Sequence, residues 1–318
     1  MRSGSNRAPA MPSRRAVLRY GALAVLAVPL AACGTGYDDA PDPLDALARA
    51  ARADGEAART LATSGGGGSG GDVANAVSRV RFAHADAMQR EVRRANRPPA
   101  PSAPPAEQVI DLSALGDRLA AAAKAARDLG RTAPRYRAGL LGSVAAGCAA
   151  AQALSPSLGE PPEFEFDTMT IGGNADQESV AALQLALDTE HAAVWAYGLV
   201  TAFLPGDFTE SLDDAVTEHR ARRDACRGAL AKAGATPNSA EAAYLPPDPV
   251  DDIPTAMSVV IAAETDTAVA WRAVLERTDH AALRGFGLDA LTASGTRATR
   301  WRAESGDTHA ATALPGLP

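Results

Sequence analysis

The sequence has little lysine, few aromatic residues and few cysteines. Of its 318 residues only two are lysine, so arginine supplies 29 of the 31 basic residues; 4% are aromatic and three are cysteine. The formal net charge of −7 lacks the basic excess that a general nucleic-acid-binding protein carries, so we expect no nucleic-acid partner. Glycine and proline together supply 50 residues, too few for a low-complexity chain.

Several catalytic motifs are also missing. The sequence contains no G-x-S-x-G, no Cys-x-x-Cys and no phosphate-binding glycine loop. The glycine run at 65–71 follows a predicted helix and contains no lysine, so we interpret it as a flexible linker. No nucleophile constellation is therefore predicted, and no catalytic residue is assigned.

Alanine is the abundant residue, at 74 positions or about 23% of the chain. Alanine has the highest helix propensity, and runs of β-branched or aromatic residues are few, so the sequence predicts an all-α fold. Because alanine buries little area per residue, such helices must pack closely to build a core.

The first 33 residues have the features of an export signal. Arg14 and Arg15 form a twin-arginine pair, an apolar run follows at 20–32, and residues 30–33 (Leu-Ala-Ala-Cys) resemble a bacterial lipobox. The run is shorter than the about 20 residues that a spanning helix needs. We predict a twin-arginine-type lipoprotein signal peptide over 1–33; the alternative is a short hydrophobic helix of the fold.

By resemblance to bacterial lipoproteins, Cys33 is expected to become the lipidated first residue of the mature protein. Residues 1–32 hold five arginines and no acid, so their removal changes the net charge to −7 − 5 = −12. An acidic body is not attracted to anionic headgroups, so the lipid is the sole anchor expected, holding the protein at the extracytoplasmic face of the cell membrane. The other cysteines, Cys148 and Cys226, either form a disulfide or are two small buried residues.

The rest of the chain divides into two helical halves. The predicted parts are a tether at 34–42, an N-terminal module at 43–155, a linker at 156–175, a C-terminal module at 176–305 and a disordered tail at 306–318. Apolar residues at helical spacing predict four helices in each half, at 43–62, 72–96, 111–129, 134–154, 176–203, 212–233, 253–277 and 281–302. The fold class predicted is two up-down four-helix bundle modules, and the halves are either a duplication or similar by chance.

Three polar residues fall on the apolar stripes of the second half. Glu190, His219 and Glu264 lie near the middle of three different helices, each in line with inward-facing residues. A buried carboxylate is costly unless it is paired or binds a metal. Helical bundles hold two metals with a Glu on each of two helices and Glu-x-x-His on each of the other two. These three residues are therefore the candidate metal ligands.

The pattern of a di-metal site is incomplete. No Glu-x-x-His occurs on the sixth helix, where position 222 is arginine, and the last helix has no Glu or His on its stripe. Arg222 or Arg223 could neutralise Glu190 or Glu264 in place of a metal. Two alternatives stay open: a bound metal, or a metal-free network of salt bridges and hydrogen bonds. In the first half, Asp54 and His84 occupy corresponding positions and are expected to form a buried hydrogen-bonded pair.

The second half resembles a known family. Residues 182–198 look like the first helix of a ferritin-like domain, and 219–224 with 244–246 resemble an actinobacterial ferritin-like family of uncharacterised function. The resemblance implies an up-down four-helix bundle with one long crossover for the C-terminal module, holding iron or manganese for oxidation or peroxide chemistry. We expect a lipid-anchored ferritin-like protein with a redox or metal-handling role in the cell envelope. The alternative is a metal-free scaffold or interaction lipoprotein without a cofactor.

Overall fold

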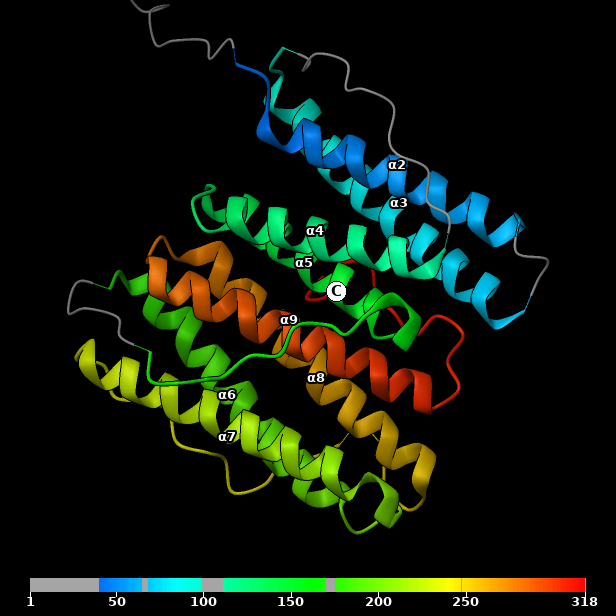
Figure 1. The fold of residues 1–318 in the computed structure, drawn as a ribbon. Helices are drawn as coiled ribbons and strands as arrows, with labels where there is room; N and C mark the ends of the chain where they lie inside the picture. Colours follow the sequence, from blue (N-terminus) through cyan, green and yellow to red (C-terminus); the bar gives the residue numbers. More distant parts are fainter. Residues whose placement is uncertain (1–39, 65–67, 99–110, 170–174, 247, 318) are drawn as a thin grey trace, which may run out of the picture. The chain divides into compact units, whose positions relative to one another are not determined.

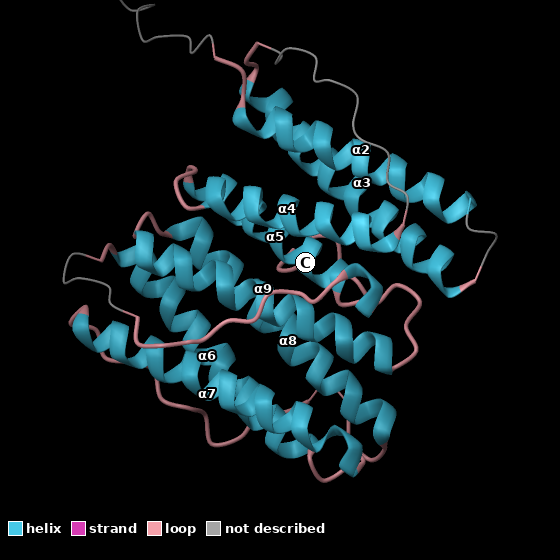
Figure 2. Ribbon diagram, viewed as in Figure 1, coloured by secondary structure: helices cyan, strands magenta, loops and turns pink. Residues whose placement is uncertain are grey.

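The protein is helical throughout the part that the computed structural model describes, with no β-strand there (Figure 2). The described residues are 40–64, 68–98, 111–169, 175–246 and 248–317. The predicted all-α class is therefore confirmed. Arg14, Arg15 and Cys33, which carry the predicted export and lipidation signals, lie outside the described residues. In the described part, no helix combines the length and the apolar character needed to cross a membrane.

Eight α-helices form the described part (Figure 1). Their bounds are α2 Pro43–Ser64, α3 Ser69–Ala95, α4 Leu112–Gly130, α5 Arg135–Gln152, α6 Gln177–Val200, α7 Thr209–Lys232, α8 Ile253–Arg277 and α9 Ala281–Glu304. Two short 3₁₀ turns, Pro156–Leu158 and Gly206–Phe208, precede α6 and α7 respectively. These bounds lie close to those expected from the apolar periodicity.

Aspartate side chains begin three of the helices. Asp111, Asp176 and Asp252 each accept a hydrogen bond from the backbone N–H three residues on, which satisfies one of the free donors at a helix start. At α8 the cap is reciprocal, because Thr255 Oγ1 also contacts the backbone N–H of Asp252 at 3.1 Å. The sequence thus specifies these starting points locally.

The central helix is α5, which packs against α4 and α3 on one side and against α8 and α9 on the other. Every residue from Ala138 to Gln152 is buried. Its glycines permit this close packing: a Cβ on Gly142 would lie 2.5 Å from Leu275 Cδ1 of α8. The small residues of α5 therefore serve to bring its neighbours near, as expected for an alanine-rich core.

The segment after α9 is packed against the helices. Ser143 Oγ of α5 donates to the carbonyl of Pro315 at 2.6 Å, and Ala310 and Pro315 are buried. A Cβ on Gly147 would lie 1.9 Å from the Ala313 carbonyl oxygen, so this glycine is what lets the segment approach. This placement differs from the disordered tail expected from the sequence, because the contacts come from helices about 170 residues away.

The two cysteines of the helical region, Cys148 in α5 and Cys226 in α7, are free and fully buried. They therefore fit the alternative of two small buried residues rather than a disulfide. Burial raises the pKa of the Cys226 thiol well above its usual value, and the nearby Glu190 carboxylate acts in the same direction.

Candidate functional site: a buried polar network

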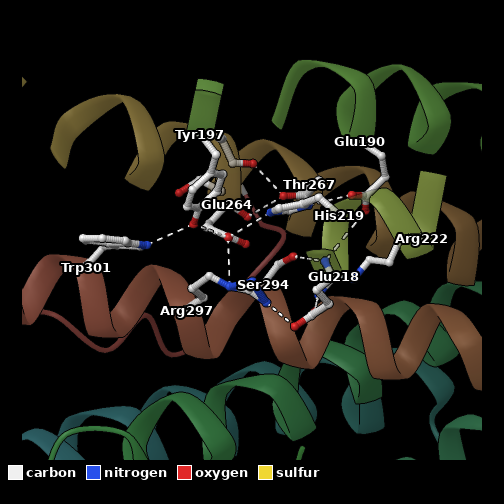
Figure 3. A network of polar contacts seen from close by, with 12 residues as sticks. Glu190, Tyr197, Glu218, His219, Arg222, Glu264, Thr267, Ser294, Arg297 and Trp301 are labelled. Carbon is white, nitrogen blue, oxygen red and sulfur yellow. Dashed lines mark hydrogen bonds and ion pairs between the residues drawn. The ribbon is translucent and has the colours of Figure 1, made fainter. Parts of the chain in front are cut away.

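Glu190 of α6, His219 of α7 and Glu264 of α8 meet in the interior, as their positions on the apolar stripes predicted (Figure 3). His219 Nδ1 lies 2.6 Å from Glu190 Oε2, and His219 Nε2 lies 3.1 Å from Glu264 Oε1. All three side chains are fully buried. The imidazole therefore bridges two carboxylates that belong to different helices.

His219 is protonated at neutral pH. Both ring nitrogens face carboxylate oxygens, which can only accept, so both nitrogens must donate. Burial opposes the charged form, but attraction to Glu264 and Glu190 and the hydrogen bonds to them outweigh it, raising the pKa of His219 to about 9. Burial likewise opposes ionisation of Glu264, yet Arg297, His219 and Arg222 together lower its pKa to about 2.

Aromatic side chains supply neutral donors to the same carboxylates. Trp271 Nε1 donates to Glu190 Oε1 at 2.7 Å, and Tyr197 Oη donates to Glu264 Oε1 at 2.6 Å. Trp301 Nε1 in turn donates to Tyr197 Oη at 2.9 Å. Burial and the negative Glu264 raise the pKa of Tyr197 well above its usual value, so its hydroxyl stays a donor.

Two arginines complete the network. Arg222 Nη1 of α7 lies 3.7 Å from Glu190 Oε1 and donates to Ser294 Oγ of α9 at 2.8 Å. Arg297 Nε of α9 lies 3.1 Å from Glu264 Oε1. Both guanidinium groups also pair with Glu218 of α7, which is about one-quarter exposed. The prediction that Arg222 neutralises one of the carboxylates agrees with this geometry.

The charges of the network balance. Glu190, Glu218 and Glu264 contribute three negative charges, and His219, Arg222 and Arg297 contribute three positive charges. Buried charges are tolerated when they are paired and hydrogen-bonded in this way. Each carboxylate of the network therefore has at least one cationic partner from this chain.

This donor set does not fit a di-metal centre. The two nitrogens of His219 point in opposite directions, each to one carboxylate, so Glu190, His219 and Glu264 do not face a common point. Glu190 Oε1 is occupied by Trp271, and Glu264 Oε1 by Tyr197 and Arg297. Within the described ranges, no group of three or more His, Cys, Asp or Glu residues is arranged to hold a metal ion. Among the side-chain nitrogen and oxygen atoms of Glu190, His219 and Glu264, Glu264 Oε2 is the one without a hydrogen-bond partner in the described part of the chain.

Arg297 and Glu218 are the members that the sequence interpretation missed. The apolar stripe of α9 has no Glu or His, and the residue that α9 directs at Glu264 is an arginine. Glu218 is adjacent to His219 and so lies about 100° around α7 from it, where it pairs with Arg222 and Arg297 at the edge of the network. Asp188 and His191, which have ligand spacing, lie apart: Asp188 accepts hydrogen bonds from Asn238 Nδ2 at 3.0 Å.

A second buried network lies in the first half, and it corrects the expected direct pair. Arg81 lies between Asp54 and His84, donating to Asp54 Oδ2 at 2.8 Å and contacting His84 Nδ1 at 3.1 Å. His84 Nε2 lies 2.5 Å from the Ala313 carbonyl oxygen, which can only accept, so Nε2 carries the hydrogen and Nδ1 accepts from Arg81. Burial, reinforced by the positive Arg81, lowers the pKa of His84 to about 3, so its imidazole is neutral.

The second half is thus a helical domain built around a largely buried, charge-balanced polar network. A family model described as a domain of unknown function (DUF4439) matches residues 182–318. A conserved hypothetical protein, rv2844, from Mycobacterium tuberculosis, whose crystal structure is known, is 39% identical to the matched part. The match covers 41% of this chain and 91% of that chain, with a TM-score of 0.40.

The DUF4439 model matches less than half of the chain, so the similarity to that family is a property of residues 182–318. No curated protein matches the chain.

Proposed function

We propose that this protein is an exported lipoprotein with a metal-free helical body that acts as a binding scaffold at the membrane surface. The twin arginines Arg14 and Arg15, the apolar run and the lipobox ending in Cys33 support export and lipid anchoring. The acidic body supports the view that the lipid, and not surface charge, holds the protein at the membrane.

The C-terminal module, 176–305, is proposed to be a ferritin-like four-helix bundle in which ion pairs replace the metals. One observation carries this proposal: Arg222 and Arg297 contact the two carboxylates, Glu190 and Glu264, that metal ions would otherwise need. A guanidinium group neutralises a buried carboxylate without a cofactor, and the net charge of the network is already zero. Further cations there would add uncompensated positive charge.

The alternative, a metal on Glu190, His219 and Glu264, is supported by a single vacant atom, Glu264 Oε2. A metal would have to displace the proton from His219 and compete with Arg297 for Glu264. If it bound iron or manganese, the protein would have a redox or metal-handling role in the envelope instead.

Metal analysis of protein exported in a bacterial host separates the two functions. We expect less than about one-tenth of an equivalent of iron, manganese or zinc in folded protein, before and after incubation with Fe²⁺ or Mn²⁺. Glu190→Gln serves as the matched control, since a ligand-removing change should lower any specific metal content. About one equivalent or more in the wild type, lost in Glu190→Gln, would establish the metal function instead.

Anchoring is tested through Cys33. Cys33→Ser should leave the protein unlipidated and move it from the membrane fraction, whereas Cys148→Ala should not change fractionation because that thiol is buried in α5. Mass spectrometry of the mature N-terminus measures the lipid directly. A Cys33→Ser variant that remains membrane-bound and a wild-type chain that keeps residues 1–32 would contradict the proposal.

A further inference from the structure

A cleft of about 450 Å³ lies between α7 and α9, beside the buried network. Its lining includes Glu218 and Arg297, the two most outward members of that network, together with Phe208 and Trp301. The rings of Phe208 and Trp301 pack with their centroids 5.5 Å apart and give the cleft an aromatic wall. The cleft thus combines an apolar wall with a charged base, as small-molecule sites do.

The outer lining of the cleft is acidic. Glu163, Asp214 and Glu304 are exposed carboxylates of the lining, and Arg300 is the exposed base among them, which leaves a net charge of −2. Glu218 and Arg297 add no net charge, because both are paired within the neutral network. A cleft with this charge favours a cation over an anion.

One buried hydroxyl in the lining has no partner. Thr292 and Thr299 of α9 donate their hydroxyls to the carbonyls of Leu288 and Gly295, at 2.7 and 3.0 Å. Thr296, between them on the same helix, is 6% exposed, and its Oγ1 has no hydrogen-bond partner in the described part of the chain. Leaving a buried hydroxyl without a hydrogen bond costs free energy. The Thr296 hydroxyl is therefore available to form a hydrogen bond with a polar group that enters the cleft.

We propose that this cleft binds a small organic cation: an ammonium group on a short body that carries a hydroxyl. The carboxylates of Asp214 and Glu304 attract the ammonium, and the aromatic wall of Phe208 and Trp301 packs against its methyl or methylene groups. The hydroxyl bonds Thr296. A free cation fits better than a lipid headgroup, because the phosphate of a headgroup would be repelled by the acidic lining.

Calorimetric titration of the full chain tests the proposal with three probes. Choline has both the quaternary ammonium and the hydroxyl, 3,3-dimethylbutan-1-ol is its neutral isostere, and phosphocholine adds the phosphate of a headgroup. We expect a choline dissociation constant below about 1 mM and at least roughly tenfold weaker binding of the isostere. Phosphocholine should also bind more weakly than choline.

Substitutions in the lining of the cleft test whether choline binds there. Asp214→Asn combined with Glu304→Gln should weaken choline binding at least about threefold, since each exposed carboxylate contributes modestly. Thr296→Val should weaken it as well. Asp213→Asn is the matched control, because Asp213 is an exposed acid on α7 that does not line the cleft. The two acidic residues are exposed, so their replacement leaves the core intact even if Thr296→Val disturbs folding.

Three results would overturn the proposal: no choline binding below about 10 mM, equal binding of the neutral isostere, or equal affinity in the double variant and Asp213→Asn. Phosphocholine binding as tightly as choline would contradict the choice of a free cation and favour a lipid headgroup. The outcome is independent of the metal content of the network, so failure here does not affect the proposed metal-free core.

Discussion

Arg297 Nε of α9 lies 3.1 Å from Glu264 Oε1 of α8, so a cation of the last helix neutralises a carboxylate that sequence patterns assign to a metal. Both side chains are largely buried, at 14% and 0% exposed. Because the same guanidinium also pairs with Glu218, this contact joins α7, α8 and α9.

Arg297→Met should destabilise the protein. Glu264 would keep its charge in the interior with one cation fewer, and breaking a buried pair in this way costs roughly 3 kcal/mol. Denaturant unfolding measures the change. Arg300→Gln, an exposed position on the same helix, is the control and should shift the free energy of unfolding by less than about 0.5 kcal/mol.

Adding Glu264→Gln to Arg297→Met should recover part of the loss, because the unpaired carboxylate is then absent. A double variant no more stable than Arg297→Met alone would show that the packing of the arginine, and not its charge, supports the core.

His219 should make the protein less stable in alkali. Attraction to Glu264 and Glu190 overcomes burial and raises the folded-state pKa of His219 from 6.5 to about 9. The folded state therefore holds more protons between pH 6.5 and 9, and the stabilisation, roughly 1–3 kcal/mol, is lost as the pH rises through this window. His219→Gln should be less stable at pH 6.5 and show a flatter profile from there to pH 9. An unchanged alkaline slope in the variant would count against a protonated His219.

His84 should make the protein less stable in acid. Burial and the adjacent Arg81 lower its folded-state pKa from 6.5 to about 3. The unfolded chain binds the extra proton, so stability is full above pH 6.5 and is lost as the pH falls toward 3. The window from pH 4.5 to 6.5 isolates this histidine from the carboxylates. His84→Asn should flatten the profile there, while the exposed His309→Gln should leave it unchanged.

Gly147→Ala should detach the C-terminal segment from α5. A Cβ at this position would lie 1.9 Å from the Ala313 carbonyl oxygen and 2.6 Å from His84 Nε2, so the segment must move. We expect faster amide exchange over residues 305–317 and a lower free energy of unfolding, measured by hydrogen exchange and denaturant titration. Gly228→Ala is the control: its Cβ would meet nothing within 4 Å, so the added helix propensity should stabilise the protein by about 0.5–1 kcal/mol. Unchanged amide exchange over residues 305–317 in Gly147→Ala would mean that the segment stays packed against α5 despite the added Cβ.

The bounds of the helices and three members of the buried network could be predicted from the sequence. Helix bounds depend on local periodicity and on capping residues such as Asp176 and Asp252, which are visible in a single chain. Glu190, His219 and Glu264 could be recognised because each interrupts an apolar stripe, and stripes of packed helices face one interior.

The remaining contacts depend on long-range packing. An arginine at the edge of a helix is long enough to reach either solvent or a buried partner. The sequence therefore does not show that Arg297 turns toward Glu264. Nor does it show that Arg81 lies between Asp54 and His84. The docking of the C-terminal segment depends on Gly147, whose importance becomes apparent only once the Ala313 carbonyl lies against it.

That docking also affects the timing of folding. During synthesis α2, α3 and α5 leave the ribosome before Ala313 and Pro315 have been added to the chain. Until these residues emerge, the His84 N–H lacks the Ala313 carbonyl, and the surface of α5 around Gly147 and Ser143 lacks the segment that covers it. Helices α3 and α5 therefore wait for residues 313–315, so we expect this part of the protein to reach its final packing only after those residues have left the ribosome.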